Sequence, residues 1–507
     1  MNHKNKIGWI VAGLLLGILM AAMDNTIVAT AMGTIVGELG GFDKFVWITS
    51  AYMVSMMAGT PIFGKLSDMY GRKMFFVTGL TLFILGSVLC GTAQSIVQLS
   101  VYRAVQGIGS GAIMPIAFTI IFDIFPPEKR GKVSGVFGSV FGVSSIFGPL
   151  LGALLTETLN WRWIFYINLP LGILSLVFIV CFYHESLQRS KQKIDWWGAV
   201  TLVAAVVSLM FALELGGNEY PWNSVEIIGL FAAFAVFLSF FLYVETKVQD
   251  PILSFQMFKN RLFAASNVAS LCIGITFIAA TVYIPIFVQG VLGGTAANSG
   301  TILTPMMLGS VAGSQIGGFL TSKTSYRNIM LGACLFFLGG ISLLGTLTPE
   351  TTRMAVMGAM ILTGFGVGFS FSVLNMAAIH PFDMRQRGSA TGTNRFMISL
   401  GTTLGITGFG IIQRSLFTNK MTGSIGDVSS GIGNTNSLLT PAERLKLPQE
   451  TLDSIVSALS SSISQTFLWA LIPAALGAIS IFFMTNERMP ASFKHAAKSS
   501  EPKRETV

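Results

Sequence analysis

The sequence predicts an all-α protein that crosses a membrane many times, and its composition carries that prediction. Of its 507 residues, 52% are hydrophobic and only 11% are charged. A soluble domain carries about a quarter charged residues, because its surface must stay hydrated. Lipid therefore has to surround most of this chain. The 55 glycines and 40 phenylalanines suit closely packed membrane helices with aromatic filling.

Windows of about 20 apolar residues, the length that spans a bilayer, recur along the whole chain. The first window follows Lys4 and Lys6 and could be taken for a secretory signal, but it is too long for the apolar core of one. We therefore expect fourteen membrane-spanning helices, centred near Met20, Ser55, Ile84, Gly111, Ser145, Ile173, Ser208, Ala235, Thr276, Gly309, Leu338, Ile361, Leu400 and Ala474.

Basic residues indicate on which side of the membrane each connection lies. Lys129, Arg130 and Lys132 follow the fourth span, and most of the 32 Lys and Arg lie in the tails or in connections after even-numbered spans. Because basic loops stay in the cytoplasm, we expect a multi-pass protein of the cell (inner or plasma) membrane with both termini cytoplasmic. This topology accounts for the net charge of +9, so no nucleic-acid partner is expected. Two arginines remain within the spans.

The predicted spans divide into six, two and six. Residues 1–187 form an N-terminal bundle, residues 188–250 an inserted pair, and residues 251–487 a C-terminal bundle followed by a cytoplasmic tail at 488–507. A long polar loop at 416–462 is expected on the outer side before the last span. Within it, Pro441–Arg444 has the character of a helix start and predicts a short interfacial helix.

Glycines and charges alternate in the connection between the second and third spans, at Gly64, Asp68, Gly71, Arg72 and Lys73. Glycine permits a tight turn, and an Asp at a helix end can accept hydrogen bonds from the free N–H groups of a neighbouring helix. The pattern resembles the first signature of the major facilitator superfamily. The resemblance implies a major facilitator fold with a cytoplasmic gate, in which Asp68 braces the second bundle and Arg72 pairs with Asp123. A solvated basic turn is the alternative.

Two further patterns support this resemblance. Residues 318–323 repeat the first signature weakly, with Ser322 in the place of the Asp, which indicates internal duplication. The fourth span carries Leu99, Arg103 and Gln106 before a run of glycines and resembles the second signature of the superfamily. An arginine in the bilayer core costs several kcal/mol unless it has a partner or faces water, so Arg103 needs a purpose. The alternative is an arginine that reaches the membrane interface.

The fifth span carries small residues at four-residue spacing, at Gly138, Gly142, Gly148, Pro149 and Gly152. Such spacing lets two helices approach closely, and the proline permits a bend. The set resembles the antiporter signature of the superfamily. Residues 23–28 of the first span, residues 161–170, and residues 216–218 before Trp222 resemble the fourteen-span drug:proton antiporter family.

Asp24 is the only charge between Lys6 and Glu38 in the first span. Burial of an isolated carboxyl disfavours its charged form, so such a group can exchange a proton at physiological pH. A cationic lipophilic drug could satisfy the same carboxylate, and competition between drug and proton, coupled to alternating access, is antiport. Arg103 favours proton release if it faces the same cavity. A helix-packing role is the alternative for Asp24. Glu214 is a second acid, and whether it contributes to proton coupling stays open.

The resemblance implies a proton-coupled multidrug efflux antiporter that exports lipophilic compounds, cationic or zwitterionic, by alternating access. Its expected partners are small-molecule substrates, protons and the surrounding lipid bilayer, and we expect it to be a monomer. Aromatic, polar and methionine side chains at helix positions from both halves could line the substrate pocket. These are Tyr52, Met56, Phe141, Tyr283, Gln289, Asn375 and Phe396. Ordinary packing is the alternative for each of them.

Other functions have less support. Export of a physiological metabolite or lipid, and a transporter-like membrane sensor, are compatible with the same motifs. No metal site, cofactor or enzyme activity is expected, because the four cysteines lie apart within apolar runs and no paired-carboxylate or His-Glu-x-x-His pattern occurs.

Overall fold

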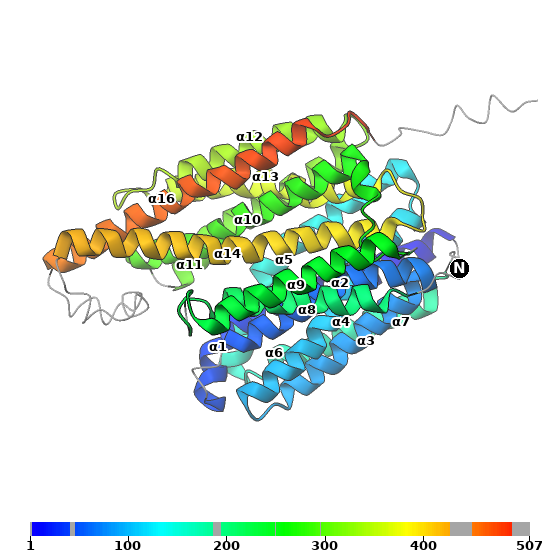
Figure 1. Cartoon of the computed structure of the whole chain (residues 1–507), viewed down its shortest axis with the longest axis horizontal. Coiled ribbons are helices and arrows are strands. Elements are labelled where there is room, and N and C mark those ends of the chain that lie inside the picture. The colour runs from blue at the N-terminus through cyan, green and yellow to red at the C-terminus, as the bar shows by residue number, and fades with distance from the viewer. Residues whose placement is uncertain are drawn as a thin grey trace, which may run out of the picture.

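Helices make up most of the residues that the structure describes (Figure 1). The computed structural model describes residues 3–40, 46–185, 194–217, 219–248, 250–294, 296–425 and 449–488. Within these ranges no β-strand occurs, apart from one isolated bridge between Gly216 and Tyr220. The helices are α1 (His3–Leu39), α2 (Val46–Tyr70), α3 (Arg72–Gly91), α4 (Ile96–Ile124), α5 (Pro127–Thr158), α6 (Trp163–Tyr166), α7 (Asn168–Phe182), α8 (Trp196–Leu215), α9 (Val225–Lys247), α10 (Arg261–Gly290), α11 (Ala296–Leu320), α12 (Tyr326–Leu344), α13 (Arg353–Ile379), α14 (Arg387–Ile425) and α16 (Gln449–Phe482), with a 3-10 turn η2 (Met257–Lys259) before α10.

Each of the fourteen predicted centres falls within one of these helices, with α6 and α7 together forming the sixth span. Twelve helices in the described ranges are long and apolar enough to cross a membrane. The other two, α2 and α11, are long enough but more polar. They pack chiefly against α4 and α13, respectively, and helices that face other helices need less apolar surface than helices that face lipid.

Many helices begin at a side chain that accepts a hydrogen bond from the first turn. Such a cap satisfies an N–H group that has no partner within the helix. The capping residues are Ser95, Asp195, Ser224, Asn260, Ser325 and Thr352.

The helices form two bundles with the α8–α9 pair beside them (Figure 1). Helices α1–α7 share two buried apolar clusters, and α10–α16 share a third. In the inserted pair, α8 packs mainly on α9, and outside the pair it contacts α2 and, to a smaller extent, α14. Helices α2, α4 and α13 end on the side of the molecule where α3, α5 and α14 begin. We call this side the basic end, because Arg72, Arg130 and Arg387 lie there. Figure 1 places the N-terminus at the basic end.

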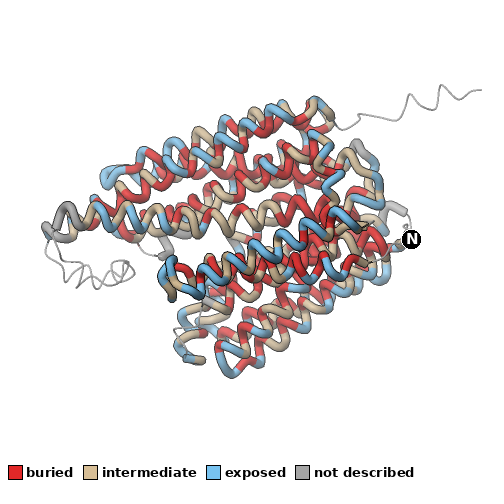
Figure 2. The backbone as a smooth tube through the Cα atoms, viewed as in Figure 1, coloured by how far each residue is buried: buried red, intermediate tan, exposed pale blue. Residues whose placement is uncertain are grey.

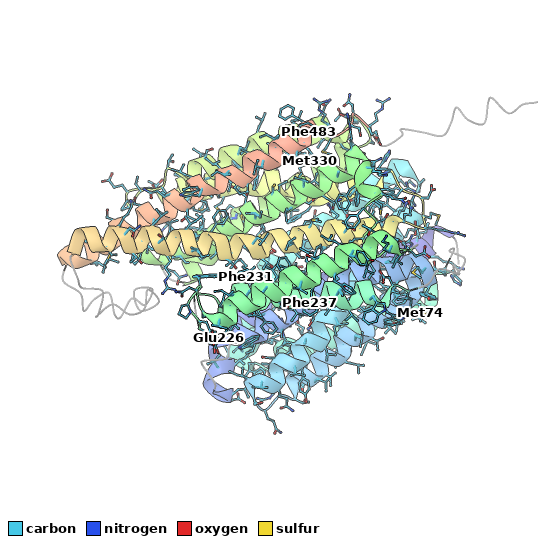
Figure 3. All side chains as sticks on the ribbon, viewed as in Figure 1. Met74, Glu226, Phe231, Phe237, Met330 and Phe483 are labelled. Atoms are coloured by element: carbon cyan, nitrogen blue, oxygen red, sulfur yellow. The ribbon has the colours of Figure 1, made fainter. Side chains whose placement is uncertain are left out.

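Large apolar side chains cover the outside of the molecule. Val236, Leu335 and Phe483 are 65%, 74% and 70% exposed. Figure 2 shows the exposed positions recurring along the outer faces of the helices, and Figure 3 shows apolar side chains there, including Phe237 on α9 and Phe483 after α16. A surface of this kind belongs in lipid, because water would leave it poorly solvated.

The predicted polar loop at 416–462 is wrong for the part that the structure describes. Residues 416–425 continue α14 and residues 449–462 belong to α16, and these two stretches project beyond the other helices (Figure 1). Polar side chains join the two helices: Gln413 donates to the Ser462 hydroxyl at 3.3 Å and Lys420 donates to Ser461. The helix start expected at 441–444 and the tail beyond 488 lie outside the described residues.

Candidate functional site

Asp68 joins the two bundles at the basic end. It lies near the end of α2, and its carboxylate accepts hydrogen bonds from the backbone N–H groups of Gly388 at 2.8 Å and Ser389 at 2.7 Å. These are first-turn groups of α14, which lack partners within their own helix. The carboxylate also complements the positive end of the α14 dipole. A side chain of the N-terminal half therefore caps a helix of the C-terminal half, as the first signature implies.

Arg72 extends this connection. It donates to Asp68 at 2.9 Å, forms an ion pair with Asp123 of α4 and donates to the Met384 carbonyl of the C-terminal half. Arg387 of α14 donates to the other oxygen of Asp123 at 3.0 Å. The Arg72, Asp68 and Asp123 side chains are at most 1% exposed. Two arginines thus neutralise two buried carboxylates across the boundary between the halves.

Glycines allow the backbones to meet at the same place. A Cβ at Gly64 would lie 2.5 Å from the Gly388 carbonyl oxygen, and a Cβ at Gly131 would lie 2.1 Å from that of Gly318. Gly71 has a φ of 112°, which favours glycine. The weak repeat therefore contacts the other half through Gly318, whereas the Ser322 hydroxyl, just past the end of α11, donates to the Phe319 carbonyl of that helix at 2.9 Å.

The α5 glycines divide between two neighbouring helices. A Cβ at Gly138 or Gly142 would overlap Ser314 or Val311 of α11, at 1.9 and 2.5 Å. A Cβ at Gly148 or Gly152 would overlap Thr26 or Thr30 of α1, at 1.9 and 2.1 Å, and Pro149 lies between them. Toward the basic end α5 therefore packs on the C-terminal half, and farther along it packs on the N-terminal half.

Asp24 lies at the centre of a buried polar cluster in the N-terminal half. Arg103 of α4 forms an ion pair with it, and Gln106 and Asn168 donate amide hydrogen bonds to its other oxygen at 2.8 and 3.0 Å. Ser87 links the two amides, at 2.8 and 3.2 Å. The side chains of Asp24 and Arg103 have no exposed surface. The prediction of an isolated carboxyl is wrong, because residues distant in the chain supply three donors to it.

Tyr52 connects this cluster to the space between the halves. The Arg103 guanidinium lies 4.1 Å from the centre of the Tyr52 ring, a cation–π contact. The Tyr52 hydroxyl lies 2.7 Å from the Ser110 hydroxyl. Ser110 in turn lines the central cavity, so a change at the cavity wall can reach the ion pair through one side chain.

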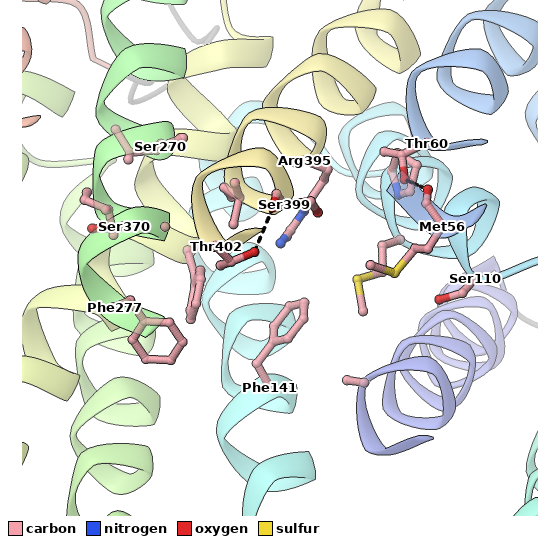
Figure 4. A pocket seen from close by; sticks show the side chains of 18 residues that line it. Met56, Thr60, Ser110, Phe141, Ser270, Phe277, Ser370, Arg395, Ser399 and Thr402 are labelled. Atoms are coloured by element: carbon pink, nitrogen blue, oxygen red, sulfur yellow. Dashed lines mark hydrogen bonds between the residues drawn. The ribbon is translucent and has the colours of Figure 1, made fainter. Parts of the chain in front are cut away.

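The central cavity has a volume of about 230 Å³ and lies between the two halves (Figure 4). Its wall is mostly apolar and aromatic, with small hydroxyl side chains at intervals. The lining residues include Met56, Ser110, Phe141, Phe277, Phe371 and Arg395. Helices α1, α2, α4 and α5 contribute from one half and α10, α13 and α14 from the other. An apolar cavity with a few polar groups, placed where two halves meet, is a typical small-molecule site.

Comparison with known proteins agrees with this architecture. The sequence profile described as the Major Facilitator Superfamily matches residues 14–406. The chain belongs to the major facilitator superfamily. It is accordingly a multi-pass membrane transporter of small molecules, and the relatives of this facilitator are transporters rather than enzymes.

Two relatives from Bacillus subtilis match nearly the whole facilitator. Multidrug resistance protein 3 is 55% identical over 97% of this chain and 98% of its own length. Multidrug transporter protein MdtP is 35% identical over 95% of this chain and 94% of its own length. Among solved structures, the proton:xylose symporter XylE superposes with a TM-score of 0.63 at 12% identity, over 97% of this chain and 98% of the symporter. This last similarity supports the fold alone.

Two of the seven predicted pocket residues, Met56 and Phe141, line the central cavity of this facilitator. Tyr52 lies behind the wall, bonded to Ser110. Phe396 packs in a cluster with α2 and the inserted pair, and Tyr283 lies in the core of the C-terminal half.

Asn375 and Gln289 do not line the cavity either. Asn375 is 1% exposed on α13, beside cavity residues Phe371 and Leu374 of the same helix. Helix position alone cannot separate these cases, because neighbouring residues on a helix point in directions about 100° apart.

The sequence analysis missed the most polar group of the cavity. Arg395 of α14 lines it and is 8% exposed. A signal existed, since any arginine within a predicted span is unusual. Glu214, by contrast, lies at the far end of α8 and lines a separate cavity with Trp222 and Arg414.

Proposed function

We propose that this facilitator exports lipophilic compounds from the cytoplasm in exchange for protons. The basic end faces the cytoplasm in this proposal, in keeping with the distribution of Lys and Arg. Support for the substrate class comes from the 55% identical relative named for multidrug resistance and from the apolar cavity. The observation that carries the coupling is the buried Asp24–Arg103 ion pair and its link through Tyr52 to Ser110.

The conformation described here has its halves joined at the basic end. Asp68, Arg72 and Asp123, together with the Gly64–Gly388 and Gly131–Gly318 contacts, close the route from that side. In the proposed cycle, substrate enters the cavity from the cytoplasm before this closed state forms, and it is then released outside, where a proton is taken up in exchange. Parting of these contacts opens the cavity to the cytoplasm.

Proton and substrate compete indirectly in this mechanism. Asp24 does not line the cavity, so a substrate does not reach its carboxylate directly. Protonation of Asp24 removes the charge that holds Arg103, and Tyr52 then loses the guanidinium that covers its ring. A substrate packed against Met56 and Ser110 holds Tyr52 in place, and Tyr52 in turn holds Arg103 beside Asp24. The ion pair requires an ionised Asp24, so substrate binding favours release of the proton.

Transport in proteoliposomes with an imposed pH gradient tests this proposal. With a panel of lipophilic dyes, wild type should accumulate dye against its concentration gradient. Asp24→Asn, which keeps the shape and loses the titratable group, should lose uphill transport and its pH dependence while retaining downhill movement. Tyr52→Phe keeps the ring beneath Arg103 and removes the Ser110 bond, and should weaken coupling severalfold.

Two results would contradict the proposal. Uphill export by Asp24→Asn with an unchanged pH profile removes Asp24 from the mechanism. Failure of wild type to move any dye under a proton gradient favours a physiological metabolite or a sensor role over multidrug export.

A further inference from the structure

Arg395 is a buried cation without a counter-charge. It lies on α14 and is 8% exposed. Its Nε and Nη2 atoms have no hydrogen-bond partner in the described part of the chain. No carboxylate of that part forms an ion pair with it, whereas the buried Arg72 pairs with two carboxylates and the buried Arg103 with one. Arginine stays charged in proteins, so this charge has to be accommodated in some other way.

The contacts of Arg395 compensate only part of the cost of its burial. Its guanidinium lies 4.6 Å from the Phe118 ring centre and 5.1 Å from that of Phe141. Cation–π contacts attract a buried cation, but they return less free energy than the removal of that ion from water costs. An ionisable group kept in a membrane protein at such a cost marks a functional site.

The space in front of Arg395 is suited to an amphipathic ligand. Figure 4 shows its guanidinium directed into the cavity on the side of Phe141, with Ser399 and Thr402 on the same helix and Phe277 across the cavity. Arg395 is the only charged side chain among the described residues that line the cavity. The remaining wall offers aromatic rings and hydroxyl groups, which suit an apolar ring system with a few acceptors.

We propose that Arg395 is the recognition residue for an anionic group, a carboxylate or a sulfonate, on an aromatic substrate in the central cavity. This inference rests on the proposed export function and adds the charge of the substrate to it. The planar guanidinium presents paired donors that match a carboxylate, and the ligand then supplies the counter-charge that the protein lacks. Zwitterions satisfy this site through their acidic end, while compounds with only a positive charge are disfavoured.

Three naphthalene probes of nearly equal shape test the charge preference. These are 1-naphthylacetate, the neutral 1-naphthylacetamide and the cationic 1-naphthylmethylammonium. Binding is measured by fluorescence titration of the full chain in nanodiscs, independently of any proton gradient. Wild type should bind the acetate at least about tenfold more tightly than the amide, because a hydrogen bond to a charged group contributes on the order of a factor of ten. The ammonium should bind most weakly.

Arg395→Met, a substitution of similar length, should abolish the preference for the acetate and leave amide binding within about twofold. Arg395→Lys should retain part of the preference, because the charge remains and the paired geometry is lost. Arg414→Met is the matched control, since Arg414 lies on the same helix, is exposed and donates to the Gly217 carbonyl outside the central cavity. It should behave as wild type.

Thermal unfolding provides a second readout. Apolar replacement of an uncompensated buried charge is often neutral or stabilising, so the Tm of unliganded Arg395→Met should equal or exceed that of wild type. The inference is overturned if wild type binds acetate and amide equally, or if Arg395→Met keeps the preference or unfolds at a clearly lower temperature. Failure of the proposed export function is detected separately, in the transport assay, as the absence of proton-driven dye movement by wild type.

Discussion

At the scale of single residues, the buried charges of this facilitator differ in how they are compensated. Asp68 and Asp123 each receive donors from both halves, so their interactions with α14 exist only while the basic end is closed. Asp24 receives all its donors from the N-terminal half, so its environment can persist when the halves move. The first set is suited to gating and the second to proton coupling.

Substitution of Asp68 by Asn should weaken the closed basic end. The amide keeps one acceptor oxygen but directs an NH2 group at a backbone N–H, and it leaves Arg72 with less opposing charge. Loss of such a cap costs about 1–2 kcal/mol, so the closed state should lose roughly a factor of ten in population. Alkylation of a cysteine placed at Thr391, which is fully buried, should accelerate correspondingly.

Ser322→Ala is the control for this measurement. Ser322 occupies the equivalent position in the weak repeat, and its hydroxyl donates to the Phe319 carbonyl at the end of α11, within the C-terminal half, so alkylation should proceed at the wild-type rate. An equal acceleration in both variants, or none in Asp68→Asn, would show that the Asp68 cap does not hold the basic end closed.

At the scale of helices, α5 and α11 approach closely through small residues. A Cβ at Gly138 would lie 1.9 Å from the Ser314 hydroxyl oxygen, which itself donates to the Gly135 carbonyl at 3.1 Å. Gly138→Ala should therefore separate α5 from α11 at a cost of about 1–3 kcal/mol, the usual range for overpacking. Transport turnover should fall severalfold while the amount of folded protein in the membrane stays unchanged.

A second substitution should reverse this effect. Ser314→Ala removes the overlapping oxygen and leaves the serine Cβ position 3.1 Å from the new methyl group, so the double variant should recover most of the turnover. Gly339→Val on α12 serves as the control, because no neighbouring atom lies within 4 Å of a Cβ there. Absence of rescue in the double variant would mean that the defect arises elsewhere than at this contact.

The helices also indicate which features were accessible to sequence analysis. Hydropathy and the Gly-rich signatures are local, and they predicted the fourteen spans and the residues of the closed basic end. The extension of α14 to Ile425 was not predicted, because it lies outside the apolar windows and the contact of Lys420 with Ser461 of α16 joins residues distant in the chain. The donors to Asp24 were missed for a related reason: Asn168 lies 144 residues away, and no local pattern relates the two.

At the scale of the whole molecule, the cavity arises only when two bundles meet. Its residues come from seven helices of both halves. The residues predicted for the pocket lie on five of these helices, but only Met56 and Phe141 are on the face that lines the cavity. Arg395 is the clearest example, because its burial and its lack of a partner are properties of the assembled bundle. The role of such a residue depends on how the bundles move relative to one another.

A reversible cross-link between the bundles tests that movement directly. Thr119 of α4 and Thr391 of α14 belong to different halves, are fully buried, and their hydroxyl oxygens lie 3.1 Å apart. With the four native cysteines replaced by serine, Thr119→Cys/Thr391→Cys should form a disulfide under mild oxidation, because the side chains already point at each other. The cross-link should stop proton-driven transport, and reduction should restore it, since the basic end must open once in every cycle. Each single cysteine variant should transport equally before and after oxidation. Continued transport by the fully cross-linked protein would mean that substrates cross without separation of α4 from α14, and alternating access about the central cavity would then be wrong.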